Sequence, residues 1–158
     1  DAFEHTLQSR FASLTEAHDL LAYTGNDLPL ETLLKRLLKP YIATRSSVRL
    51  EGPPIVIGKT KIIPICLIVH ELATNAAKYG ALSSDAPLVI TWEQNGDTVA
   101  LQWQEQTARL QKHAHEDNNG FGSKLLAVAA RQLDGKLTSD WHGDTLTHAL
   151  YFPNNMTA

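Results

Sequence analysis

Three polar residues, Glu71, Asn75 and Lys78, recur at steps of four and three residues in a segment that is otherwise largely apolar. On an α-helix these steps place the three side chains within roughly 60° of one another, with His70 and Thr74 beside them. A carboxylate, an amide and an ammonium group are unfavourable on an apolar helix unless they meet water or a ligand. This polar stripe, formed by Glu71, Asn75 and Lys78, therefore indicates either a binding site or a solvated helix face.

His70 and Glu71 also match the first half of the HExxH helix of zinc proteases. That helix requires a second imidazole four residues after the first, because both histidine ligands must lie on one helix face. Thr74 occupies this position, and His113 and His115 lie in a polar stretch further along the chain. The sequence therefore does not support a zinc hydrolase.

The composition is that of one globular domain. The chain has 158 residues, 43% hydrophobic and 20% charged, and a domain of this size buries roughly 70% of the surface that its unfolded form exposes. A single cysteine excludes an internal disulfide and a Cys-rich zinc module. A net charge of −3 does not favour a nucleic-acid or membrane-surface partner. The only methionine is Met156, so we expect the sequence to be a segment of a longer chain.

Hydrophobic periodicity predicts four helices, at residues 3–22, 29–43, 60–79 and 122–133. The alternation of apolar and polar residues predicts three successive pairs of strands. They are residues 48–51 with 55–57, 88–93 with 98–105, and 136–141 with 146–152. The polar residues 106–119 are expected to form a long loop. Paired strands separated by helices predict an α+β fold, a two-layer α/β sandwich whose mixed, mostly antiparallel sheet carries helices on one face.

The helix that carries the polar stripe is expected to begin near residue 60, because Pro64 is tolerated only close to the first turn of a helix. Gly80 is expected to end it. The longest apolar run of the chain, residues 62–69, belongs to this helix and is too short to cross a bilayer. The stripe therefore lies in the C-terminal half of a core helix.

Residues 70–82, HELATNAAKYGAL, resemble the N box of the HWE subfamily of sensor histidine kinases, within the GHKL ATPase superfamily. Further matches follow in the order expected for that subfamily: AHDLL at residues 17–21, the Trp-x-Glu signature at 103–105, a second glycine box at 120–125 and a closing Pro153. The resemblance covers roughly residues 9–153 and implies the Bergerat fold of this superfamily.

The resemblance implies an ATP site between the N-box helix and a flexible lid. On this basis Asn75 is the ligand of Mg²⁺, since an amide oxygen suits a hard cation, and Lys78 neutralises phosphate oxygens. Glu71 takes the place of a carboxylate that polarises the attacking group or a metal-bound water. His70 is interpreted as a site organiser, with a packing role as the alternative, and Tyr79 either covers the nucleotide or closes the helix end.

Further nucleotide contacts are implied on the strands and after the lid. Glu105 matches the residue that accepts the adenine amino group, while Trp103, on the same face of the strand, is expected to pack in the core. Gly120 and Gly122 let backbone N–H groups approach the phosphates at a helix N-terminus. The remaining expected contacts are Phe121, Ser123, Lys124 and Thr145.

Two features depart from the family pattern. Most relatives follow Trp-x-Glu with a glycine pair, whereas residues 106–109 are Gln-Thr-Ala-Arg and no glycine occurs between Glu105 and Gly120. The lid is therefore expected to have an unusual shape. Broader GHKL proteins carry an adenine-contacting threonine seven residues before the closing proline. That count falls on Leu146 here, and the expectation is placed on the neighbouring Thr145.

The resemblance divides the chain into the end of a dimerisation and phosphotransfer region, residues 1–24, and a catalytic ATP-binding domain, residues 25–158. It implies a protein-histidine kinase domain that uses ATP and Mg²⁺ to phosphorylate a histidine outside this chain. The family's phosphoacceptor segment is not found here, and neither His5 nor His18 has its context. We therefore expect no autophosphorylation by the chain alone.

The implied partners are an upstream dimerisation and phosphoacceptor domain and a response regulator. The full-length protein is expected to be a cytoplasmic homodimer, either soluble or membrane-attached, and the domain itself is expected to contact neither nucleic acid nor membrane. The alternative is a degenerate phosphotransfer or docking module that binds no ATP. The intact N box argues against this alternative, and the irregular lid favours it.

Overall fold

The computed structural model of the chain describes residue 8 and residues 27–42, 47–107 and 121–155. The first expected helix, apart from residue 8, and most of the expected lid loop lie outside these residues. The described helices are α2 (Leu30–Ile42), α3 (Lys59–Tyr79), the short α4 (Ala81–Ser84) and α6 (Phe121–Gln132). The last three predicted helices are therefore confirmed to within one residue at each end, and α4 was not predicted.

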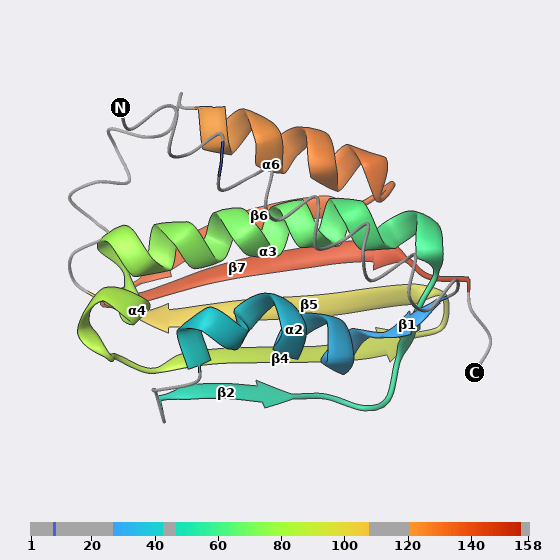
Figure 1. The fold of residues 1–158 in the computed structure, drawn as a ribbon. Coiled ribbons are helices and arrows are strands. Elements are labelled where there is room, and N and C mark those ends of the chain that lie inside the picture. Colours follow the sequence, from blue (N-terminus) through green and yellow to red (C-terminus); the bar gives the residue numbers. More distant parts are fainter. Residues whose placement is uncertain (1–7, 9–26, 43–46, 108–120, 156–158) are drawn as a thin grey trace.

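Five strands form the main sheet, in the order β2 (Val48–Glu51), β4 (Leu88–Asn95), β5 (Thr98–Gln106), β7 (Thr145–Pro153) and β6 (Lys136–His142). β2 runs parallel to β4, and the other neighbouring pairs in this sheet are antiparallel. Figure 1 shows α2 and α3 across one face of the sheet, with α6 beside α3. The predicted α+β sandwich with a mixed, mostly antiparallel sheet is confirmed.

The core lies between the helices and one face of the sheet. β5 shows the strand alternation clearly, because Leu101 and Trp103 are buried while Gln102 and Gln104 are exposed. α2 contributes four leucines with no exposed surface, which are Leu30, Leu33, Leu34 and Leu38. Burying one such side chain contributes about 1.5–3 kcal/mol, so this apolar face holds α2 on the core.

The central helix α3 accommodates a proline beyond its first turn. The helix begins at Lys59, one residue before the predicted start, and Pro64 removes one hydrogen bond from its second turn. The backbone N–H of Lys59 donates to the side chain of Asp27 at 2.9 Å, which satisfies one of the unpaired groups at the helix start. At the other end the N–H of Gly80 donates to the carbonyl of Ala76 at 2.9 Å, and the predicted stop at Gly80 is confirmed.

The second and third predicted strand pairs form as expected. Asn95 of β4 pairs with Thr98 of β5, and His142 of β6 pairs with Thr145 of β7. Each hairpin turns through a glycine with positive φ, 61° at Gly96 and 60° at Gly143. Glycine adopts this left-handed conformation at little steric cost, which is why it favours two-residue hairpin turns.

The predicted hairpin between residues 48–51 and 55–57 is wrong. β2 pairs with β4, whereas β3 (Val56–Ile57) forms a separate antiparallel ribbon with β1 (Leu28–Pro29), a strand that was not predicted. The physical reason lies in Pro53 and Pro54, which have no N–H to donate and keep the chain extended between the two strands.

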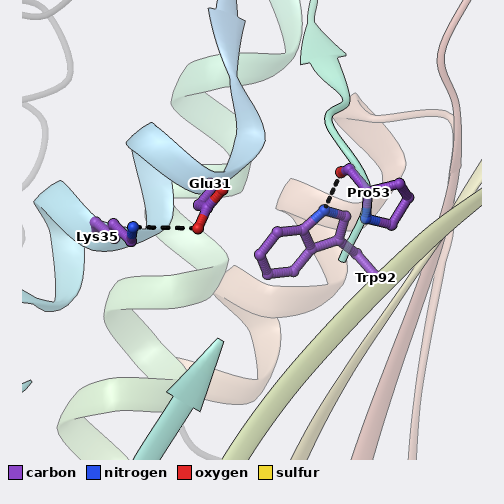
Figure 2. A network of polar contacts seen from close by, with 4 residues as sticks. All are labelled: Glu31, Lys35, Pro53 and Trp92. Carbon is purple, nitrogen blue, oxygen red and sulfur yellow. Dashed lines mark hydrogen bonds and ion pairs between the residues drawn. The ribbon is translucent and has the colours of Figure 1, made fainter. Parts of the chain in front are cut away.

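The segment between β2 and β3 is held by Trp92 of β4. The indole Nε1–H of Trp92 donates to the backbone carbonyl of Pro53 at 2.8 Å (Figure 2). Gly52 packs so closely that a Cβ atom at this position would lie 2.3 Å from the indole ring. The side chain of Trp92 thus directs the chain from the edge of the main sheet towards β3.

Candidate functional site

Glu105, near the end of β5, carries a carboxylate that is almost completely buried, with 1% of the residue exposed. One oxygen accepts a hydrogen bond from the backbone N–H of Ala81 at 3.0 Å, and the other accepts from the indole Nε1–H of Trp103 at 3.0 Å. Burial raises the pKa of Glu105, and the two hydrogen bonds counteract part of that rise. The carboxylate is therefore fixed between its own strand and the junction of α3 with α4.

The walls beside this carboxylate are apolar. The register places Leu88 of β4 and Leu146 of β7 directly opposite Glu105, and both leucines are buried. A carboxylate has about four acceptor positions, and the described residues supply two hydrogen-bond donors. The remaining positions suit a ligand that presents an N–H group.

The polar stripe of α3 runs from the core into solvent. Glu71 is 4% exposed, Asn75 is half-buried and Lys78 is exposed. A solvated helix face therefore does not describe the whole stripe, because its first member is buried. The stripe ends close to Ala81, which binds Glu105, so the polar end of α3 and the buried carboxylate lie at the same end of the molecule.

The other polar residues of the N-box segment have different surroundings. Thr74 uses its hydroxyl within α3, since it donates to the backbone carbonyl groups of His70 and Glu71 at 3.0 and 3.1 Å. The side chains of His70 and Tyr79 are half-buried. Thr74 is thus committed to its own helix, whereas His70 and Tyr79 keep part of their surface accessible to a ligand.

The start of α6 approaches the same end of α3. The Nζ of Lys61, near the beginning of α3, donates to the carbonyl of Leu133, just after α6, at 2.9 Å. The two helices are therefore antiparallel neighbours, as Figure 1 shows. Twelve residues of α6 extend about 18 Å, which brings the first turn of α6 beside the C-terminal half of α3.

The first turn of α6 carries most of the predicted second glycine box. Gly122 is half-buried and Ser123 and Lys124 are exposed. Phe121 begins the helix, while its side chain and the whole of Gly120 lie outside the described residues. The first N–H groups of a helix have no intrahelical acceptor and attract anions, so this turn suits a phosphate.

Thr145 does not join the other candidates. It pairs with Gln106, which is exposed, whereas Glu105 pairs with Leu146. Because side chains alternate between the two faces of a strand, Leu146 shares the face of Glu105 and Thr145 lies on the opposite face. Thr145 therefore stays a prediction as an adenine contact, while the count from Pro153 falls on Leu146, the residue that lies beside the carboxylate.

Two groups at this site were not predicted, the backbone N–H of Ala81 and the indole N–H of Trp103. Core packing of Trp103 was expected and is confirmed, because its side chain has no exposed surface. Its hydrogen bond to Glu105 was not expected, although their two-residue spacing on one strand was the available signal. α4, which contains Ala81, is too short to leave a periodic pattern.

Among the residues that the structure describes, no three or more His, Cys, Asp or Glu side chains form a cluster suited to a metal ion. No helix in the same part of the chain has the length and apolar character needed to span a membrane.

Comparisons with known proteins agree on one class. The chain is 33% identical over 153 residues to the blue-light-activated histidine kinase of Rhizobium johnstonii, in a match that covers 94% of this chain and 43% of the relative. It is also 33% identical over 159 residues to blue-light-activated histidine kinase 1 of Erythrobacter litoralis, covering 96% of this chain and 44% of that protein. No family model matches the chain.

Among solved structures, the histidine kinase domain of the Erythrobacter litoralis EL346 blue-light activated histidine kinase superposes with a TM-score of 0.70 at 17% identity, covering 94% of this chain and 74% of that one. The fold is therefore that of a histidine kinase catalytic domain. These similarities support an HWE-family histidine kinase catalytic domain, in agreement with the resemblance of residues 70–82 and 103–105. It spans less than half of the length of the two curated relatives.

Proposed function

We propose that residues 25–158 form the ATP-binding catalytic domain of a two-component sensor histidine kinase, which transfers the γ-phosphoryl group of ATP to a histidine outside this chain. We propose further that residues 1–24 are the end of its dimerisation and phosphotransfer region. The observation that carries the proposal is a convergence at one end of the sheet. The buried carboxylate of Glu105, the polar end of α3 and the N-terminal turn of α6 all lie at that end (Figure 1).

In this proposal Glu105 recognises the base. Its carboxylate is buried between Leu88 and Leu146 and has acceptor positions left beyond the Ala81 and Trp103 donors. The amino group of adenine is a suitable donor for them. Guanine presents a carbonyl oxygen at the equivalent position, which a buried carboxylate repels. The site therefore favours adenine nucleotides.

The phosphates lie between α3 and α6. Asn75 supplies a half-buried amide oxygen for Mg²⁺ and Lys78 an exposed ammonium group for the phosphate oxygens. The first turn of α6 supplies backbone N–H groups around Gly122, with Ser123 and Lys124 beside them. When bound, Mg²⁺ neutralises the charge that develops on the transferred phosphoryl group. The protein's own contribution is to position the nucleotide.

Two N-box residues complete the catalytic assignment. Glu71 is a buried carboxylate one helical turn before Asn75, and we assign it to the orientation of the attacking group or of a metal-bound water. His70, its half-buried neighbour, organises the site. Tyr79, at the end of α3, covers the nucleotide.

The domain requires partners that provide the phosphoacceptor histidine and receive the phosphoryl group. We propose an upstream dimerisation and phosphoacceptor domain, present twice in a full-length homodimer, and a response regulator. Because ATP is the phosphoryl donor, we place the domain in the cytoplasm.

Calorimetric titration with Mg-ADP tests the proposal. We expect the chain to bind Mg-ADP and the Asn75→Ala variant to bind at least about tenfold more weakly, a loss of about 1.4 kcal/mol. Gln104→Ala is a matched control, because Gln104 is an exposed residue on the opposite face of β5 from Glu105. Absence of binding by the folded wild-type chain at millimolar nucleotide would support the alternative, a degenerate phosphotransfer or docking module.

One observation favours that alternative and makes the titration decisive. The segment after β5 has no glycine pair, and its Thr107 is buried, with its N–H donating to the carbonyl of Asp144 at 2.7 Å. The start of the lid is therefore tied to the turn between β6 and β7.

A further inference from the structure

The hydrogen bond between Trp103 and Glu105 joins two buried side chains of one strand. The indole of Trp103 has no exposed surface, and its Nε1–H lies 3.0 Å from Oε2 of Glu105. An indole nitrogen donates and does not accept, so the carboxylate must be the acceptor in this contact. A hydrogen bond to an ionised group is stronger than one between neutral groups.

The second oxygen of Glu105 is held from a different element. Oε1 accepts from the backbone N–H of Ala81, at the junction of α3 and α4. A glutamate side chain has three rotatable bonds, and two donors from separate elements restrict all of them. The carboxylate is therefore already oriented before a ligand arrives, which lowers the entropy lost on binding.

Filling the core does not by itself require an indole at position 103. Its cross-strand neighbours are Ile90 and His148, and a phenyl ring would fill most of the same space. What the indole adds is one N–H group, and this group contacts the carboxylate assigned to the base. Trp92 shows the contrast, because it is also buried but its N–H contacts the carbonyl of Pro53.

We propose that Trp103 is a positioning residue for base recognition, whose indole N–H holds the Glu105 carboxylate in the orientation that accepts the amino group of adenine. This inference rests on the proposed ATP site. It assigns the specificity for adenine to a pair of side chains, in which Glu105 contacts the base and Trp103 acts through Glu105.

A binding cycle tests this pair. The dissociation constants of Mg-ADP and of the Mg-diphosphate of purine riboside, which lacks only the 6-amino group, are measured by calorimetry. Their ratio reports what the amino group contributes. For the wild-type chain we expect a ratio of at least about 10, because the amino group donates to a charged acceptor.

Trp103→Phe is expected to reduce this ratio to about 3 or less while Trp92→Phe leaves it at the wild-type value. Trp92→Phe is the matched control, since it also removes a buried indole and its hydrogen bond, at a position away from the base. A merely structural role for Trp103 predicts weaker binding of both nucleotides with an unchanged ratio.

A second variant of Trp103 keeps the shape of the buried ring, so that its result does not depend on whether Trp103→Phe folds. Replacement of Trp103 by 3-benzothienylalanine preserves the ring outline and substitutes sulfur for the N–H group. A reduced ratio in this variant supports the proposal, and a wild-type ratio in it overturns the proposal. The failure of the proposed function gives a different result, because the wild-type chain then binds neither nucleotide.

Discussion

Trp92 and Trp103 lie on adjacent strands, and both are buried, but their indole N–H groups have different kinds of partner. Trp92 donates to the neutral backbone carbonyl of Pro53, at the segment that leaves the edge of the sheet. Trp103 donates to the carboxylate of Glu105, at the end of the fold where α3 ends. The same type of buried side chain, a tryptophan, thus serves two regions of the molecule with different physical demands.

The difference shows how a fold separates structural from functional polar groups. A buried N–H requires an acceptor, and a backbone carbonyl satisfies it without placing charge in the core. A carboxylate satisfies it as well but brings a desolvated charge with unused acceptor positions. We therefore expect changes near Trp92 to alter stability alone, and changes near Trp103 to alter both stability and nucleotide binding.

The largest expected effect is a loss of stability from a change beside Trp92. Gly52→Ala places a Cβ atom 2.3 Å from the indole of Trp92, and we expect it to lower the free energy of unfolding by more than about 3 kcal/mol. Urea denaturation measures this loss. Gly96→Asn is the control, because Gly96 has open space around it and Asn tolerates positive φ. A Gly52→Ala variant as stable as wild type would contradict the packing described for this segment.

A half-buried polar ring, His148, lies opposite Trp103 on β7 and extends the comparison to pH. Burial lowers the pKa of His148 to about 4, and its Nδ1 lies 2.7 Å from the hydroxyl oxygen of Ser139. The unfolded chain takes up a proton near pH 6.5, its ordinary value, while the folded chain does not. Stability is therefore complete above pH 6.5 and falls as the pH drops towards 4.

We expect His148 to account for a loss of about 3 kcal/mol at pH 4 relative to pH 7. The measurement is urea denaturation across this range for wild type and His148→Gln, which has no titrating ring. The difference between the two curves isolates His148 from the carboxylates that also titrate. Parallel curves would show that the folded chain protonates His148 as readily as the unfolded chain.

Glu105→Gln is expected to act on both properties. A glutamine has one acceptor oxygen for the two N–H groups of Ala81 and Trp103, and its own amide N–H₂ faces the other donor. We expect a loss of about 1–2 kcal/mol in the free energy of unfolding together with weaker binding of Mg-ADP. A stable variant with unchanged affinity would place the nucleotide elsewhere.

The smallest effect is expected at Thr145. Because it lies on the face of β7 opposite Glu105, Thr145→Ala is expected to leave the affinity for Mg-ADP within about twofold of wild type. Leu146→Ala, at the neighbouring position that faces the carboxylate, is expected to weaken binding. The reverse order of effects in calorimetry would restore Thr145 as the contact.

Most of the fold could be predicted from local patterns. The periodicity around α3, the glycine at position 80 and the two late hairpins are signals that neighbouring residues create. The pairing of β2 could not be predicted in this way, because its partner β4 is about forty residues distant and parallel to it. Alternation shows that a segment is a strand and does not show which strand lies beside it.

The site could be predicted to the level of residue types. The resemblance of residues 70–82 and 103–105 indicated the polar end of α3 and Glu105, and the structure brings these to one end of the sheet. It could not indicate that Ala81 donates to the carboxylate, because that contact depends on the angle at which α3 ends. It also could not decide between Thr145 and Leu146, since one residue of register moves a side chain to the other face.

The indole N–H resonances of the wild-type chain test the central claim most directly. They are recorded by two-dimensional NMR with and without Mg-ADP at about 1 mM, and are assigned with the Trp92→Phe and Trp103→Phe variants. Nucleotide bound at Glu105 shifts the Trp103 resonance and leaves that of Trp92 unchanged. A spectrum in which Mg-ADP moves neither indole resonance, or moves only that of Trp92, would contradict a nucleotide site at this end of the sheet.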